Sequence, residues 1–286
     1  MKIGITLPNA ALGIDGDTLV DWGVRAEERG FDMVAAIDRV AYPSYEQLVT
    51  LSAIASRTER VRLMTSTLLA LTREVTLLAK QTATLDRLSN GRLVLGLSVG
   101  MRPDDFAATG TAYAERGRRY DAMLERLHAL WNGTPPVEGA REVCPPPVNG
   151  RIPIYFGTMT AKPRIARRIA RWGEGYLAVG PPEMVQPIVD SIRKAWADEG
   201  RDGSPVLVAA SYFSLGEDEE AERNILDYYG DFLPALGQAA AARMPRNADD
   251  VRRIRDVYAD AGFDEFLFSG AASNPDQVDR LAEALL

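Results

Sequence analysis

The sequence has a single histidine, His128, and a single cysteine, Cys144. A zinc centre with two or three histidine ligands cannot be assembled from this chain alone, and a disulfide within the chain is excluded. A cysteine–histidine nucleophile pair would need both residues. His128 lies in a helical pattern and Cys144 in a proline-rich segment, so we expect both to be structural. The sequence therefore predicts no metal site and no thiol chemistry.

Long apolar runs are missing as well. The N-terminal residues include no apolar stretch long enough for a signal peptide, and no run of about 18 apolar residues predicts a membrane span. With no disulfide possible, these patterns predict a cytoplasmic protein that does not use a membrane. Acidic residues outnumber basic residues by 40 to 33, which gives a net charge of −7. That balance disfavours a general nucleic-acid binder.

What the sequence does contain is a regular alternation of short apolar runs and amphipathic segments over 286 residues. The expected strands are Ile3–Leu7, Asp32–Ile37, Val61–Leu69, Arg92–Val99, Ile154–Phe156, Gly175–Val179, Val206–Tyr212 and Glu265–Phe268. Alternation with helices implies a parallel sheet covered on both faces. Eight such units predict a (β/α)8 TIM barrel, one domain over residues 1–286. Two doubly wound domains are disfavoured, because no Gly-x-Gly-x-x-Gly turn follows the first strand.

Two segments depart from a simple strand–helix rhythm. Asn132–Gly150 holds five prolines and three glycines, which predicts an irregular insertion between the fourth helix and the fifth strand. This insertion is either a lid or substrate wall, or a flexible surface loop. Later in the chain, Asp218–Ala242 has a helical pattern throughout and is expected to be one long helix.

Few acid–base groups stand at the predicted strand ends, where such a barrel places its active site. Asp38 is the only carboxylate directly after a strand, whereas Asp104 and Asp105 follow the fourth strand at a distance. Enolase-type metal sites and retaining glycosidases need several carboxylates, and Schiff-base aldolases need a lysine. Because none of these sets is visible, the sequence favours a bound cofactor that supplies the reactivity.

Three short segments are candidates for holding a cofactor. Asp38–Arg39 follows the second strand and has a functional role unless it is a surface ion pair. Thr65, Ser66 and Thr67 interrupt an apolar strand, which indicates either ordinary β-propensity or a bulge that supports a flat ring. Gly157–Thr160 leads into a helix, whose N-terminal N–H groups suit an anion such as phosphate; a plain strand-to-helix turn is the alternative.

The stretch TATLDRLSNGRLVLGLSVG (Thr82–Gly100) resembles the signature of the luciferase-like monooxygenase family around its fourth strand. Other segments fit the family in the same order along nearly the whole chain, namely RGFDMVAAIDR (Arg29–Arg39), RIPIYFGTMT (Arg151–Thr160), WGEGYLAVG (Trp172–Gly180) and AGFDEFLFSG (Ala261–Gly270). The resemblance implies a barrel that binds reduced FMN or the deazaflavin coenzyme F420 at its C-terminal mouth.

The resemblance also implies the site residues. Asp38 and Arg39 would handle protons or stabilise charge, although many relatives have histidine where this chain has Arg39. The expected cofactor contacts are Thr65, Ser66, Thr67, Ser98, Gly100, Gly157, Thr158, Met159, Val179 and Gly180. In deazaflavin-dependent members a bulge with a non-prolyl cis peptide supports the ring, and here it would fall near Ser66–Thr67. A second glycine is usual where this chain has Thr158.

The implied activity is that of an oxidoreductase. It would transfer hydride between F420 and a small organic substrate, or perform FMN-dependent monooxygenation with O2. A non-catalytic flavin-binding homologue, or a phosphate-binding barrel with isomerase or lyase chemistry, are the alternatives.

Two surface features have open interpretations. A basic cluster would attract the acidic tail of F420, or is simply solvated; it comprises Lys162, Arg164, Arg167 and Arg168. Family members commonly form homodimers through their early helices. Four leucines serve either such an interface or the packing of the barrel, namely Leu48, Leu51, Leu77 and Leu78.

Overall fold

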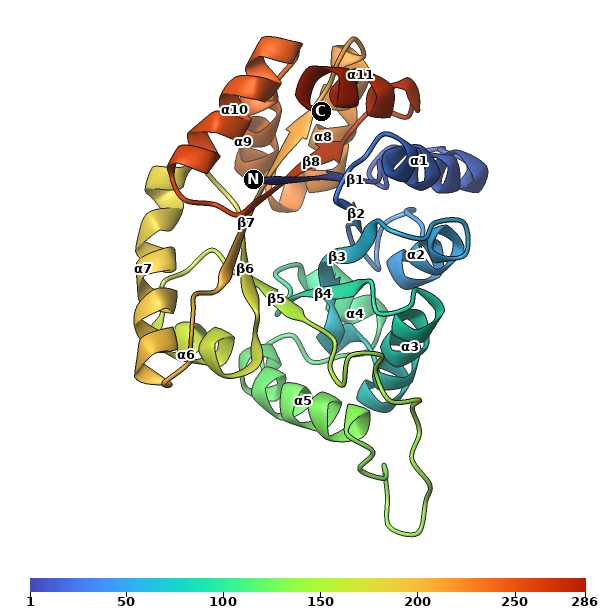
Figure 1. Cartoon of the computed structure of the whole chain (residues 1–286), viewed down its shortest axis with the longest axis vertical. Helices are drawn as coiled ribbons and strands as arrows, with labels where there is room; N and C mark the ends of the chain where they lie inside the picture. The colour runs from blue at the N-terminus through green and yellow to red at the C-terminus, as the bar shows by residue number, and fades with distance from the viewer.

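The computed structural model describes residues 1–286, except for the side chain of Asp231. Eight parallel strands close into a barrel in which each strand pairs with the next and β8 pairs with β1 (Figure 1). The strands are β1 (Lys2–Thr6), β2 (Met33–Ala36), β3 (Arg62–Leu69), β4 (Leu93–Ser98), β5 (Ile154–Gly157), β6 (Gly175–Ala178), β7 (Val206–Phe213) and β8 (Glu265–Gly270). The predicted (β/α)8 barrel is confirmed.

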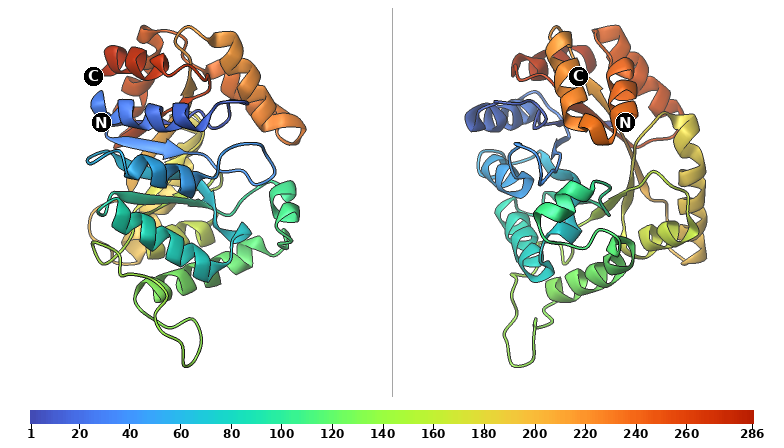
Figure 2. Two further views of the ribbon diagram at one scale, coloured as in Figure 1. Left: turned by 90° about the vertical axis from the view of Figure 1, so that its right-hand side faces the viewer. Right: turned by 180° about the vertical axis from the view of Figure 1, so that it is seen from behind.

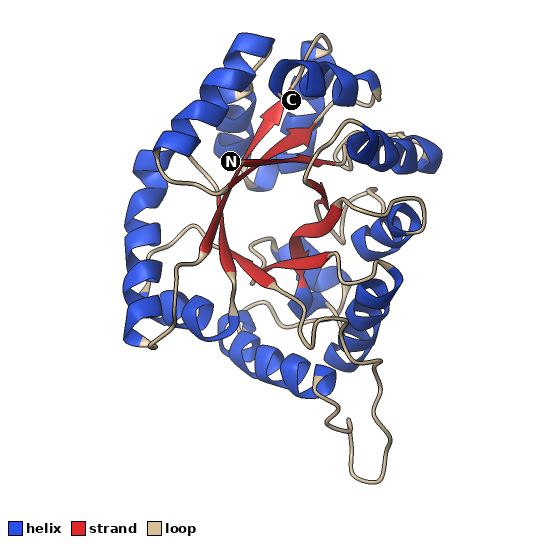
Figure 3. Cartoon of the chain, viewed as in Figure 1, coloured by secondary structure: helices blue, strands red, loops and turns tan.

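Helices surround the strands as an outer ring (Figure 3). The α-helices are α1 (Gly16–Glu28), α2 (Gln47–Ala55), α3 (Val75–Leu88), α4 (Pro103–Ala108), α5 (Arg116–Trp131), α6 (Pro163–Trp172), α7 (Pro182–Asp198), α8 (Asp218–Tyr229), α9 (Pro234–Arg243), α10 (Ala248–Asp260) and α11 (Asp276–Leu285). Two 3-10 turns are η1 (Ala70–Thr72) and η2 (Gly230–Phe232). Among the described helices, none is long and apolar enough to cross a membrane.

The single long helix expected over Asp218–Ala242 was wrong. It is divided into α8 and α9 by η2. Gly230 has φ 52°, a left-handed conformation that ends α8, and Pro234 starts α9 because its ring suits the first helical turn. The division lets α8 and α9 fold back on each other, on the side of the barrel toward which the strands point (Figure 2).

The Asn132–Gly150 segment is irregular, as predicted, but it does not cover the C-terminal end of the barrel. It joins the end of α5 to the start of β5, and connections from a helix to the next strand lie at the opposite, N-terminal face. The backbone N–H of Val148 donates to Asp86 Oδ2 at 2.7 Å, near the end of α3. The lid interpretation was therefore wrong, and the loop projects from that part of the barrel (Figure 1).

Candidate functional site

The strand ends at the C-terminal face, with the loops that follow them, form what we call the barrel mouth. Tyr155 and Leu267 pack inside the barrel. Because side chains alternate along a strand, Gly157 and Ser269, two residues further on, also face inward. Ser269 Oγ lies 3.4 Å from Thr6 Oγ1 on the neighbouring β1. Thr6, Gly157 and Ser269 therefore contribute small residues to the inner layer of the mouth.

The third strand carries the most unusual backbone of the mouth. The Ser66–Thr67 peptide is cis and does not precede a proline, and the pairing of β3 with β4 shifts register here. The predicted bulge and cis peptide are both confirmed. Thr67 Oγ1 donates to Ser98 Oγ at 2.8 Å, whereas the buried Thr65 donates to the carbonyl of Gly96 at 2.8 Å. Thr65 therefore stabilises the bulge, and the Thr67–Ser98 pair belongs to the mouth.

Gly157 leaves this hydroxyl pair uncovered. A Cβ at this position would lie 2.9 Å from Thr67 Cγ2, closer than side chains normally approach. The carbonyl of the next residue, Thr158, accepts a hydrogen bond from Tyr176 at 3.1 Å, which fixes the turn after β5. Met159 is 48% exposed at the outer side of that turn.

The segment after this turn has features expected of an anion site. Among the described side chains, none caps the N-terminus of α6, whose first residue is Pro163. Thr160 N–H donates to Thr158 Oγ1 at 3.3 Å. Pro163 has no N–H, and the N–H of Ile165 donates to the carbonyl of Lys162 at 2.9 Å. The N–H of Arg164 and the positive end of the helix dipole would therefore be what favours a phosphate here. The anion site itself stays a prediction.

The remaining predicted contacts lie on the rim of the mouth. Gly100 has φ 75°, and a Cβ there would lie 2.7 Å from the ring of Phe106. Gly180 has φ 116°, and its carbonyl accepts a hydrogen bond from Tyr258 at 2.8 Å. Val179 is 41% exposed. Both glycines are therefore required by backbone conformation, and Val179 is accessible beside Gly180.

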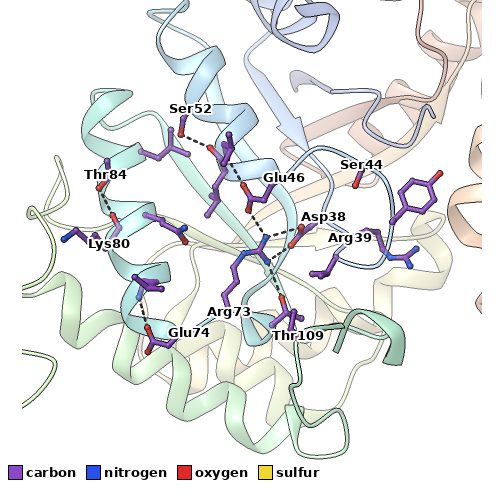
Figure 4. Close-up of a pocket in the computed structure, with 18 residues that line it drawn as sticks. Asp38, Arg39, Ser44, Glu46, Ser52, Arg73, Glu74, Lys80, Thr84 and Thr109 are labelled. Carbon is purple, nitrogen blue, oxygen red and sulfur yellow. Dashed lines mark hydrogen bonds and ion pairs between the residues drawn. The ribbon is translucent and has the colours of Figure 1, made fainter. Parts of the chain in front are cut away.

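Asp38 is buried and fully paired. Its Oδ2 lies 2.8 Å from Arg73 Nη1 and accepts the N–H of Leu69 at 2.9 Å. Burial alone would lower the pKa of Arg73, but the Asp38 carboxylate and then Glu46 outweigh it and raise that pKa. Figure 4 shows Arg73 between Asp38 and Glu46. This geometry supports a positioning role for Asp38, and the predicted proton-handling role stays untested.

Arg39 links the loop after β2 to α4 and to the end of α8. Its side chain is 6% exposed, with Nε 3.0 Å from Asp105 Oδ2 and Nη2 2.8 Å from Asp104 Oδ2. Nη1 donates to the carbonyl of Tyr228 at the end of α8, at 3.2 Å. Every guanidinium nitrogen has a partner, and two carboxylates balance its charge. The geometry therefore favours a structural role for Arg39; charge stabilisation near a ring stays a prediction.

Two residues that support the mouth were not singled out from the sequence. Arg102 is 7% exposed and donates to the carbonyls of Tyr228 and Tyr229 at 2.8 and 3.2 Å. Burial, followed by the nearby charge of Arg39, lowers the pKa of Arg102. The position of Arg102, two residues after Gly100, was a signal in the sequence that could have indicated its place at the mouth. No sequence signal indicated Arg73, because its partner Asp38 is 35 residues away in the sequence.

Two cavities flank the mouth. One, of about 690 Å³, is a groove on the outside of the barrel between α2 and α3 (Figure 4), where Val49 and Leu77 are 70% and 61% exposed. The other, of about 570 Å³, lies between the loop after β2, α4 and the end of α8, and includes Tyr228 and Phe232. The predicted site residues Asp38 and Arg39 line the groove of Figure 4, and Arg39 also lines the second cavity, but neither lining includes Ser66 or Thr67.

The other predicted features have structural partners. Arg164 and Arg168 both pair with Asp121, so only Lys162 and Arg167 of the basic cluster are exposed without an ion pair among the described residues. Leu48, Leu51 and Leu78 are buried and pack in the core, whereas Leu77 faces outward.

The two rarest residues also lie in packed surroundings. The ring of His128 stacks on Trp172 with centroids 4.8 Å apart, and burial lowers its pKa. Burial likewise raises the pKa of the Cys144 thiol. Both are placed as expected for structural residues. Among the described residues, no three His, Cys, Asp or Glu side chains come together as a possible metal site.

Residues 1–285 match the family model described as luciferase-like monooxygenase. An uncharacterized protein of Mycobacterium tuberculosis strain H37Rv is 31% identical over 168 residues, which are 56% of this chain and 59% of that protein. The match therefore spans less than two thirds of that relative. It does not by itself indicate an activity.

Solved structures share the fold. The monooxygenase RslO1 from Streptomyces bottropensis is 23% identical with a TM-score of 0.77, covering 100% of this chain and 98% of its own. An F420-dependent secondary alcohol dehydrogenase, in complex with an F420–acetone adduct, is 18% identical with a TM-score of 0.80, covering 99% and 98%. At these identities the likeness establishes the fold.

Proposed function

The chain belongs to the luciferase-like monooxygenase family, and on that basis we propose that it is an oxidoreductase that binds F420 at the barrel mouth and acts on a small organic substrate. The observation that carries the proposal is the register shift of β3 between Thr65 and Leu68, where the Thr67 hydroxyl pairs with Ser98 beside Gly157, which has no side chain. This arrangement gives a surface of backbone and small hydroxyls against which a flat ring fits.

The mouth suits such a ring in both shape and polarity. Gly157 keeps its side of the mouth open, while Thr67 and Ser98 provide hydroxyls that can reorient to hydrogen-bond a ring edge. Asp38 and Arg73 hold the end of β3 through Leu69. When bound, the cofactor would supply the hydride equivalents that the side chains of the mouth lack.

The cofactor's phosphate would lie at the turn Gly157–Met159, close to the uncapped start of α6. Val179 and Gly180 would border the ring from β6. Lys162 at the N-terminus of α6 and Arg167 in the middle of that helix are both exposed and would attract the acidic tail of F420. Because this tail has no counterpart in FMN, the exposed cations favour F420 over FMN as the first candidate.

FMN-dependent monooxygenation with O2 is the second candidate, and the monooxygenase with the same fold favours it. A non-catalytic flavin-binding protein would share the cofactor site but show no turnover. An isomerase or lyase is less well supported, because the carboxylates at the mouth are engaged in ion pairs.

We also propose that the chain forms a homodimer through α2 and α3. Val49 and Leu77 expose apolar surface on these helices and line the groove of Figure 4. Exposed apolar patches of this kind mark contact surfaces. A second copy that covers the groove would remove both side chains from water.

The test is an equilibrium titration of the purified protein with F420 and, separately, with FMN, each in oxidised and reduced form, followed by fluorescence. Saturable binding of F420 at a ratio of one per chain supports the first candidate. Tighter binding of FMN than of F420 would favour the second candidate, FMN-dependent monooxygenation, over the first. Binding of neither cofactor in either redox state would overturn the proposal.

A further inference from the structure

Asn9 stands in a tight turn directly after β1. The turn is closed by the N–H of Ala11, which donates to the carbonyl of Pro8 at 2.9 Å. Asn9 itself is 1% exposed, yet neither its Nδ2 nor its Oδ1 has a hydrogen-bond partner among the described residues. The carboxamide is therefore withdrawn from water without any protein contact that replaces it.

This lack of partners is unusual for a buried amide. Leaving a buried donor or acceptor unpaired carries a desolvation penalty, and Asn9 leaves one of each. The buried charged side chains Asp38, Asp105 and Arg102 of the mouth have partners, whereas the buried hydroxyl of Ser214 after β7 has none among the described residues. Asn9 accordingly resembles a group that is kept for a ligand.

The position of the turn is consistent with a ligand contact. β1 lies between β8 and β2, and Thr6 pairs in register with Ser269 and Ala35. The chain that enters the turn is held to β2, since the N–H of Leu7 donates to the carbonyl of Ala35 at 2.7 Å. Asn9 thus follows a strand end whose position at the mouth is fixed by its neighbouring strands.

The chemistry of the side chain indicates what it would recognise. A carboxamide presents an acceptor oxygen next to a donor NH2, which complements a C(=O)–N–H edge on a ligand. The pyrimidinedione ring of a flavin or deazaflavin has such an edge. We propose that Asn9 binds the amide–imide edge of the cofactor ring, an assignment that rests on the proposed function.

The test compares Asn9→Leu with Gln47→Leu. Gln47 is also buried with both amide atoms unpaired, but it lies at the start of α2, outside the barrel. For Asn9→Leu we expect the Kd for F420 or FMN to rise at least tenfold, while the Tm of the cofactor-free protein stays equal or rises because an unpaired amide is removed. For Gln47→Leu the Kd should stay within twofold of wild type.

Three results would overturn the assignment. A Kd for Asn9→Leu within twofold of wild type would show that the amide does not contact the cofactor. A weaker Kd together with a Tm lowered by several degrees would show a structural role, with a hidden water as the partner. If the wild-type protein bound neither cofactor, the proposed function would fail and this assignment with it.

Discussion

The guanidinium of Arg73 forms a bidentate ion pair with Asp38, with Nη1 2.8 Å from Oδ2 and Nη2 3.3 Å from Oδ1. The two side chains are 16% and 3% exposed. Through the N–H of Leu69, Asp38 also fixes the backbone two residues beyond the cis Ser66–Thr67 peptide. The strand-end carboxylate therefore acts on the mouth by supporting its backbone.

Arg73→Met is expected to destabilise the protein by about 3–5 kcal/mol, because it leaves Asp38 buried without a counter-charge. Urea unfolding monitored by circular dichroism measures the change. Arg118→Met is the matched control, since Arg118 and Glu115 form an exposed pair at 76% and 52%, and its effect should stay under about 1 kcal/mol. Equal effects of the two substitutions would refute the supporting role.

Gly157→Ala should weaken cofactor binding and destabilise the fold by about 1–3 kcal/mol, because its Cβ would press on Thr67. Gly117→Ala in α5 is the control, since a Cβ there meets nothing within 4 Å, and a helical glycine-to-alanine change should stabilise by about 0.5–1 kcal/mol. Titration with the cofactor and thermal unfolding measure both effects. Unchanged affinity in Gly157→Ala would place the ring elsewhere.

Leu77→Glu should shift a dimer toward monomers, because it puts a charge on the apolar wall of the groove. Leu88→Glu is its control, since Leu88 is 64% exposed on the same helix but does not line the groove. Sedimentation velocity over a range of concentrations distinguishes the species. If both variants sediment like the wild-type protein, α3 is not the interface.

Stability should fall as the pH drops below about 6.5, because burial lowers the pKa of His128 in the folded state. Between that folded-state pKa and the unfolded value the unfolded chain binds more protons, so acid favours unfolding. His128→Phe retains a ring against Trp172 but removes the titration. Its urea midpoint should therefore decrease less than that of wild type between pH 7.5 and pH 5.5, and parallel decreases would contradict the account.

The barrel could be predicted because strand and helix alternate in regular units and each strand is apolar on both faces. The cis peptide followed from resemblance to a family, since the residues Ser66 and Thr67 alone indicate no such bond. Long-range partners could not be predicted. Arg39 and Asp105 are 66 positions apart in the sequence, and the role of Arg39 depends on how the loop after β2 packs against α4 and α8.

The prediction that Asn132–Gly150 could be a lid was wrong for a different reason. Proline and glycine content identifies an irregular segment but does not tell which end of the barrel it occupies. The position of the segment after a helix and before a strand identifies that end, because such connections lie at the N-terminal face. The break between α8 and α9 was visible in Gly230 and Pro234, but the helical pattern on either side concealed it.

A crystal structure of the protein with bound F420, or with FMN if that binds more tightly, tests the central claim most directly. We expect density for the ring against the Ser66–Thr67 peptide, between Ser98 and Gly157, and density for the phosphate near the start of α6. Ring density in the groove between α2 and α3, or anywhere outside the barrel mouth, would contradict the account.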